Sequence, residues 1–247
     1  MQRVVNDERR MTVLQHLEEL RPVLMISGGT WVLATLVAFT FNGRLLDVLE
    51  RPIKGVLGHG HHLADVPIVT SITEPLTIPL KVSALAGLVL ALPVILWEVW
   101  SFVSPGLRPA ERRFAAPFGA SALALFAVGG CFAYFVMPIG LNFLAGFLGD
   151  NATFLPDLNA YLSFFTLLIA IFGVTFELPI AVILLGLVGV VSSGWLSQRR
   201  KGIWVGIILV ALVVTPGADP FTPTALFVPL IVLFEASILV LARVFHR

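Results

Sequence analysis

Residues 171–180, IFGVTFELPI, place one carboxylate in a long apolar run. From residue 158 to residue 198, Glu177 is the only aspartate, glutamate, lysine, arginine or histidine. Such a run is long enough for a membrane-spanning helix, which needs about 20 apolar residues. A carboxylate inside such a helix is tolerated only beside water or a polar partner. The stretch therefore predicts a spanning helix with a polar site inside the bilayer.

The composition of the whole chain supports this interpretation. The 247 residues are 57% hydrophobic and 13% charged, with a mean hydropathy of +0.95, whereas a soluble domain is about a quarter charged. A net charge of +1 argues against nucleic-acid binding, which requires a basic face. The single cysteine, Cys131, excludes an internal disulfide, and we expect it to serve packing only.

Six apolar segments predict an all-α integral membrane protein with a single domain, residues 1–247. We expect spanning helices at residues 22–42, 75–102, 114–138, 158–188, 202–214 and 221–241. The last two are separated by TPGADPFTP, residues 215–223, whose prolines and glycine predict a turn. We expect both of these helices to be short. Residues 202–214 extend about 20 Å against a hydrocarbon core of about 30 Å, so that this hairpin lies shallow or lines a wet cavity.

The distribution of lysine and arginine predicts the orientation. Twelve of the sixteen basic residues lie before the first span, between the second and third, before the fifth, or after the sixth. The other side holds Arg44, Arg51 and Lys54, and Lys81 is expected to extend to that interface. The positive-inside rule then places both termini in the cytoplasm. Residues 43–74 and 139–157 are expected to cap the opposite face.

The N-terminal 21 residues are predicted to form a cytoplasmic amphipathic segment. They are charged, and no A-x-A site follows the first apolar run, so a cleaved signal is not expected. Thr12 and Gln15 have the spacing of a capping box, which makes Met11 an alternative start.

No catalytic motif occurs in the chain, and we predict neither an enzyme nor a cofactor. H-E-x-x-H, G-x-S-x-G, Walker and Cys-x-x-Cys patterns are all absent. The nearest metal candidate is the trio His59, His61 and His62, which a solvated loop explains better than a metal site.

Two acids on the predicted cytoplasmic side are candidates for binding. Val13, Leu17 and Leu20 make one helical face, and Glu19 points away from it. Glu111 follows a proline-stiffened turn and adjoins two arginines. On spacing alone, both acids are explained as solvated surface residues.

An ordered set of motifs resembles the TatC family, the receptor subunit of the twin-arginine (Sec-independent) protein translocase. The motifs are HLEELR (16–21), LPVILWEVWSFVSPGL (92–107), ERR (111–113), AYFVMPIGLNFL (133–144), LNAYLSF (158–164), FGVTFELPI (172–180) and TPGADPFTP (215–223). The resemblance extends from Met11 to the end of the chain. It implies a concave, glove-like bundle without enzymatic activity that binds the twin-arginine signal peptides of folded cargo proteins.

The resemblance also implies a signal-binding site. Its two acids match Glu19 and Glu111, although Glu18 is a rival that only the motif register disfavours. The other residues carried over are Arg21, Phe102, Pro105 and Leu107, the last three as an apolar floor. A carboxylate can receive the planar arginine fork through two hydrogen bonds, whereas lysine offers a point charge.

The chain departs from the family pattern at two positions near this site. Val23 stands where another basic residue is usual, and Glu98 stands where glutamine is common. Either difference is expected to alter signal preference.

Three interpretations of Glu177 stay open. In the first, Glu177 is a protonated structural group. In the second, it draws water into the cup, the concave face of the bundle, and contacts the small single-span Tat subunits of TatA and TatB type. In the third, it belongs to a proton relay. The resemblance places its carboxylate facing the cup. Glu235 is expected to be a second polar contact, and Pro52 and Asp219 are expected to be structural on the outer face, with Asp219 capping the last helix.

The resemblance implies an oligomeric, multi-pass protein of the inner membrane, in contact with lipids, that exports cargo at the expense of the proton gradient. The alternative function is a proton-coupled small-solute transporter using Glu177 and Lys81. Transporters commonly contain repeated halves, and no such repeat is visible here. An intramembrane hydrolase would need a nucleophile and base, which the sequence does not offer.

Overall fold

Helices form nearly all of the described chain. The structure is a computed structural model that describes residues 13–57, 68–104, 115–146, 157–215 and 219–244. Its helices are α1 (Val13–Phe39), α2 (Asn42–Leu57), α3 (Glu74–Val103), α4 (Ala115–Ala145), α5 (Leu158–Phe176), α6 (Leu178–Val188), α7 (Ser193–Gln198), α8 (Arg200–Val214) and α9 (Phe221–Arg243). Within these residues the β contact is a single bridge between Ile68 and Asp157.

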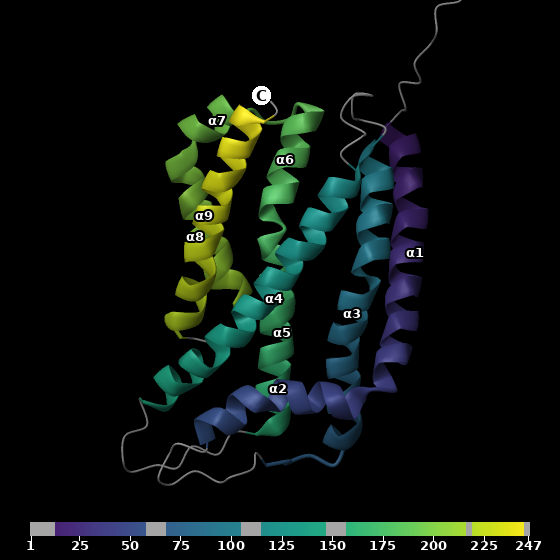
Figure 1. The fold of residues 1–247 in the computed structure, drawn as a ribbon, viewed down its shortest axis with the longest axis vertical. Helices are drawn as coiled ribbons and strands as arrows, with labels where there is room; N and C mark the ends of the chain where they lie inside the picture. The colour runs from purple at the N-terminus through teal and green to yellow at the C-terminus, as the bar shows by residue number, and fades with distance from the viewer. Residues whose placement is uncertain (1–12, 58–67, 105–114, 147–156, 216–218, 245–247) are drawn as a thin grey trace, which may run out of the picture.

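The long helices form one upright bundle, drawn in Figure 1. The helices α1 and α3 lie side by side, α4 crosses the middle obliquely, and α8 and α9 form a pair at the far edge. The helix α6 continues in the direction of α5. The helix α2 lies across one end, and the start of α1 and the C-terminus lie at the other.

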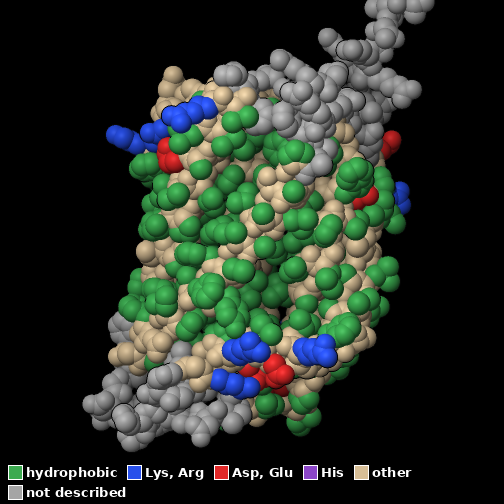
Figure 2. Space-filling model, in the orientation of Figure 1, with side chains coloured by type: hydrophobic (Ala, Val, Ile, Leu, Met, Phe, Trp, Pro, Cys, Tyr) green, Lys and Arg blue, Asp and Glu red, His purple; other side chains and the backbone are tan. Residues whose placement is uncertain are grey.

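In the described part of the chain, five helices are long and apolar enough to cross a membrane. They are Leu20–Phe39, Glu74–Val103, Pro117–Ala145, Leu158–Val188 and Phe221–Arg243. This confirms the prediction of an all-helical chain with several membrane-spanning helices. Figure 2 shows the same pattern on the surface, because charged side chains gather toward the two ends and hydrophobic ones fill the zone between them.

The expected helix bounds need correction at both the fourth and the ninth helix. The helix α4 continues past Pro138 to Ala145, because a membrane helix can contain proline when neighbouring groups satisfy the freed backbone. The final helix is not short: α9 has 23 residues and contains Pro229. The helix α8, with 15 residues, is indeed short.

The helix α2 closes one end of the bundle. It belongs to a segment expected only to cap this face, and its strong amphipathic character suits a helix that lies along an interface. The hydroxyl of Tyr134 donates to the carbonyl of Val48 at 3.0 Å, and that of Tyr161 donates to the carbonyl of Leu49 at 2.8 Å. Tyr134 on α4, which is partly buried, and Tyr161 on α5, which is buried, therefore fix the orientation of α2.

Close backbone packing joins α1 to α3. A side chain added at Gly87 would lie 2.6 Å from the Cα of Thr35, so only glycine allows this approach. The indole of Trp31 donates to the carbonyl of Ala84 at 2.9 Å on the same interface. Because lipid removes the hydrophobic drive between spanning helices, small residues and such hydrogen bonds carry much of the association.

We expect Gly87→Ala to destabilise the protein, since the new methyl group must push α1 away from α3. Overpacking of this kind costs about 1–3 kcal/mol. The measurement is the thermal unfolding midpoint of the purified protein in detergent. Gly28→Ala is the matched control, because nothing lies within 4 Å of its added carbon. Equal midpoints for the two variants would contradict the close packing.

Candidate functional site

Glu177 stands at a break in the longest apolar span. The helix α5 ends at Phe176 and α6 begins at Leu178, whereas a single helix was predicted for residues 158–188. The cause is Pro179, which has no N–H to donate and whose ring crowds the carbonyl four residues earlier. The helical direction is kept, so the break leaves one acidic residue between two helical segments.

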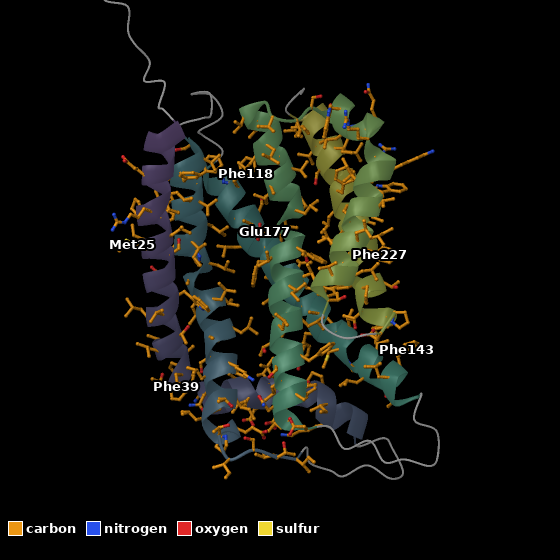
Figure 3. All side chains as sticks on the ribbon, turned by 180° about the vertical axis from the view of Figure 1, so that it is seen from behind. Met25, Phe39, Phe118, Phe143, Glu177 and Phe227 are labelled. Atoms are coloured by element: carbon orange, nitrogen blue, oxygen red, sulfur yellow. The ribbon has the colours of Figure 1, made fainter. Side chains whose placement is uncertain are left out.

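The carboxylate of Glu177 faces a cavity rather than a partner. Both of its oxygens are buried and lack a hydrogen-bond partner among the described residues. The cavity measures about 650 Å³ and is lined from α5, α6, α8 and α9 by Val174, Leu178, Ile203, Gly206, Ile207 and Leu230, among others. Figure 3 places Glu177 near mid-height of the bundle. An unpaired buried acid beside such a space favours the entry of water or of a polar group from another chain.

Glu235 is already engaged within the chain. Its Oε1 lies 3.0 Å from Nε of Arg200 and accepts a hydrogen bond from the indole of Trp204 at 3.1 Å. These contacts tie α9 to α8. Glu235, predicted as a second polar contact, therefore forms a polar link inside the final hairpin.

Lys81 lies far from Glu177 along the bundle. Its Nζ donates to Oδ1 of Asn159 and to the hydroxyl of Ser163, both at 2.8 Å. Ser163 precedes Glu177 by 14 residues in the same span, which corresponds to about 21 Å of helix. The structure therefore does not bring together the acid and base on which the transporter alternative depends.

The expected signal-binding residues lie largely outside the described part of the chain. Glu111, Pro105 and Leu107 fall in residues 105–114, and Glu19 lies in α1 with its side chain outside the description. Arg21 is exposed on α1, and Phe102 is partly buried in the last turn of α3. The start of α1 and the end of α3 lie at the same end of the bundle. His59, His61 and His62 also fall outside the described residues.

Comparison with known proteins identifies the family. The family model described as Sec-independent protein translocase protein (TatC) matches residues 15–229. The chain belongs to the TatC family. A TatC from Frankia casuarinae is 37% identical over 95% of the chain, which spans 66% of that longer protein. A TatC from Carboxydothermus hydrogenoformans is 33% identical over 95% of the chain and 94% of its own length.

A solved structure has the same fold. The crystal structure titled Twin Arginine Translocase Receptor TatC matches with a TM-score of 0.78 and 34% identity, covering 94% of this chain and all of that one. These matches confirm the family resemblance, and the relatives are named as components of protein transport rather than as enzymes. A multi-pass membrane protein agrees with the five apolar helices.

A polar network that the sequence analysis did not predict stabilises the α2 end of the bundle in this member of the TatC family. The buried carboxylate of Glu74 accepts from the backbone N–H groups of Thr70 and Ser71 at 3.0 and 3.1 Å. The hydroxyl of Thr70 donates to Oδ2 of Asp157 at 2.7 Å, and the N–H of Leu158 donates to the carbonyl of Ile68 at 2.9 Å. These bonds attach the segment before α3 to the start of α5.

Two other residues expected on this face have structural contacts. Asp219 accepts from the backbone N–H of Thr222 at 2.6 Å and from its hydroxyl at 2.9 Å, at the start of α9. Pro52 is buried within α2.

Asp157 is the N-cap of α5. Its Oδ1 accepts from the N–H of Ala160 at 2.7 Å. This bond, followed by the one from Thr70, holds the pKa of the Asp157 carboxyl below its usual value. Because the folded pKa is lowered, the stabilisation is present above the unfolded value of about 3.9 and is lost as pH falls through the folded value. The signal in the sequence was an aspartate directly before a helical run.

We expect Asp157→Ala to lower stability at neutral pH by about 1 kcal/mol, the usual value of a helix cap. Asp157→Asn, which retains a cap oxygen, should remain closer to the parent. On acidification from pH 5 to pH 3, the unfolding midpoint of the parent should fall more than that of Asp157→Asn. The measurement is thermal unfolding in detergent across this range, and parallel curves would refute the role of this carboxylate.

Proposed function

We propose that this chain is the receptor subunit of a twin-arginine translocase. It binds the twin-arginine signal peptides of folded cargo and recruits small single-span subunits of the TatA and TatB type. The observation that carries the proposal is the match, over 94% of the chain, to a protein titled as a twin-arginine translocase receptor. The protein acts in the inner membrane as an oligomer, with six spans in a glove-like arrangement and both termini in the cytoplasm.

The pairing of α1 with α3 supports a signal site at Glu19 and Glu111. These helices run antiparallel, and Gly87 meets Thr35 at their closest approach. Continued toward the end of the bundle, this register brings residue 19 opposite the last two turns of α3. Phe102 belongs to the last of these turns, and Glu111 follows nine residues later in the chain. The fold thus supports a signal site in which Glu19 and Glu111 lie at the same end of the bundle.

The chemistry of arginine explains why two acids are suited to this signal. A guanidinium stays charged at every physiological pH and presents parallel N–H groups that a carboxylate accepts in pairs. Two carboxylates held at a fixed separation favour Arg-Arg over Lys-Lys, since an ammonium lacks the planar fork. The apolar residues Phe102, Pro105 and Leu107 then receive the less polar part of the signal.

The Glu177 cavity is the proposed contact for a partner helix. It lies beside α8, which at 15 residues extends about 22 Å and falls short of a hydrocarbon core of about 30 Å. A short helix beside an unpaired acid thins the local bilayer and offers a polar group to an incoming helix. We propose that Glu177 draws partner subunits into the cup during transport driven by the proton gradient.

Removal of either receptor acid should weaken signal binding. Losing one charged hydrogen-bond partner costs about 1.5–3 kcal/mol, so Glu19→Ala and Glu111→Ala should each bind a twin-arginine peptide roughly ten to a hundred times more weakly. The measurement is peptide binding to the purified protein in detergent. Glu18→Ala is the matched control for the adjacent rival acid. Parental binding by both variants would overturn the assignment.

Substitution of Glu177 should affect transport and leave signal binding intact. Glu177→Gln should bind signal and fold nearly normally, since glutamine keeps a polar group in the cavity. Glu177→Ala should reduce cargo export and partner crosslinking, because nothing polar remains at the break. Val174→Ala, which changes the same cavity without a charge, is the control. Parental export by Glu177→Ala would leave Glu177 without a role in partner recruitment.

A further inference from the structure

A second cavity lies at the corner where α1, α2 and α3 meet. It is an apolar groove of about 660 Å³. The residues that define it are Ala38 of α1, Leu45 and Val48 of α2, and Val82, Ala86 and Leu90 of α3. None of them borders the Glu177 cavity, which lies beside α8. The groove is therefore separate from the Glu177 cavity.

The depth of the groove matches one leaflet of a bilayer. Along α3, Val82 and Leu90 are eight residues apart, which corresponds to about 12 Å. Half of the hydrocarbon core measures about 15 Å. The helix α2 lies across the end of the bundle and bounds the groove there. The groove thus begins at an interfacial helix and ends near the middle of the membrane.

The length of the groove fits a lipid chain better than a spanning protein helix. A spanning partner would require a surface over the full hydrocarbon thickness of about 30 Å. Acyl chains are thinner than a helix and enter from the leaflet that surrounds the groove.

Cations line the edge of α2 next to this groove. Arg44 and Arg51 are seven residues apart, so they project from the same edge of the helix, adjacent to the face formed by Leu45 and Val48. Both arginines are exposed, and in the described part of the chain neither forms an ion pair. Figure 2 shows charged side chains gathered at this end of the molecule.

The third cation of α2 is neutralised. Lys54 lies 2.7 Å from Glu50 in an ion pair one turn away on the same helix. This contact, and then the charge of Asp47, raises the pKa of Lys54. Glu50 is therefore engaged with Lys54. Asp47 lies three residues from Arg44 and four from Arg51, so this edge of α2 carries two positive charges and one negative charge.

We propose that the groove binds an anionic phospholipid of the adjoining leaflet. Its acyl chains lie against α3, and its phosphate is held by Arg44 and Arg51. Guanidinium groups bind phosphate through paired hydrogen bonds.

Native mass spectrometry of the full chain in dodecyl maltoside tests the proposal with two probes, dioleoyl phosphatidylglycerol and dioleoyl phosphatidylcholine. The parent should retain phosphatidylglycerol in preference. The double variant Arg44→Gln/Arg51→Gln should bind it at least about tenfold more weakly, the loss expected for one charged hydrogen bond. Ala86→Phe, which fills the groove, should lose both lipids.

Two controls separate the site from general charge and folding effects. Lys54→Gln removes one positive charge from the same helix and should bind phosphatidylglycerol like the parent. Arg44→Lys/Arg51→Lys keeps the charge and should retain most of the preference. Equal binding of the two lipids by the parent, or undiminished phosphatidylglycerol binding by the glutamine double variant, would overturn the proposal.

A photoreactive residue at position 48 distinguishes a lipid from a protein occupant in native membranes. A lipid adduct is expected. A crosslink to another protein would show that a helix fills the groove and would also overturn the proposal. Signal binding by the arginine variants should equal that of the parent, so this test is independent of the receptor function.

Discussion

Within a bilayer, every backbone polar group must be satisfied inside the protein, and this constraint governs the whole structure. It accounts for a chain that is almost entirely helical in its described part, with its β contact confined to one bridge at the α2 end. It also concentrates the polar networks at the ends, where Glu74 and Asp157 organise one face and Glu235 joins α8 to α9. Glu177 is an acid within a spanning segment whose carboxylate has no partner among the described residues, and it occurs where Pro179 interrupts the helical hydrogen bonds.

The helix break at Glu177 combines an unusual local structure with a candidate functional residue. A proline in a helix leaves one backbone carbonyl without its helical N–H partner, and here a cavity lies beside the break. The short helix α8 forms the opposite wall. One proline, one acid and one short helix therefore come together at a largely apolar cavity, with Glu177 near mid-height of the bundle.

The packing of the bundle divides into two kinds of contact. Phe165, Phe172 and Phe234 are fully buried in the centre, and the ring of Phe132 stacks on Phe172 with centroids 5.8 Å apart. At the α1–α3 edge, the contact depends instead on the close approach that Gly87 allows and on the hydrogen bond from the indole of Trp31. The outward face of α1 remains apolar and exposed, as expected for a helix in contact with lipid.

Sequence alone determined the membrane character, the presence of several apolar helices and the family. Apolar length and charge are local properties, and the family motifs lie in a fixed order. The sequence also identified Glu177, because a single acid in a long apolar run can be recognised without knowledge of the fold. It missed the break at Pro179, the length of α4 and α9, and the polar network of Glu74, Thr70 and Asp157. The helix bounds were missed because a proline can end a membrane helix, bend it or do neither, according to its neighbours in the fold. The polar network was missed because Thr70 is 87 residues from its partner Asp157. Tertiary structure alone decided whether Glu177 and Glu235 had partners, since hydrogen bonding depends on which helices the fold brings within reach.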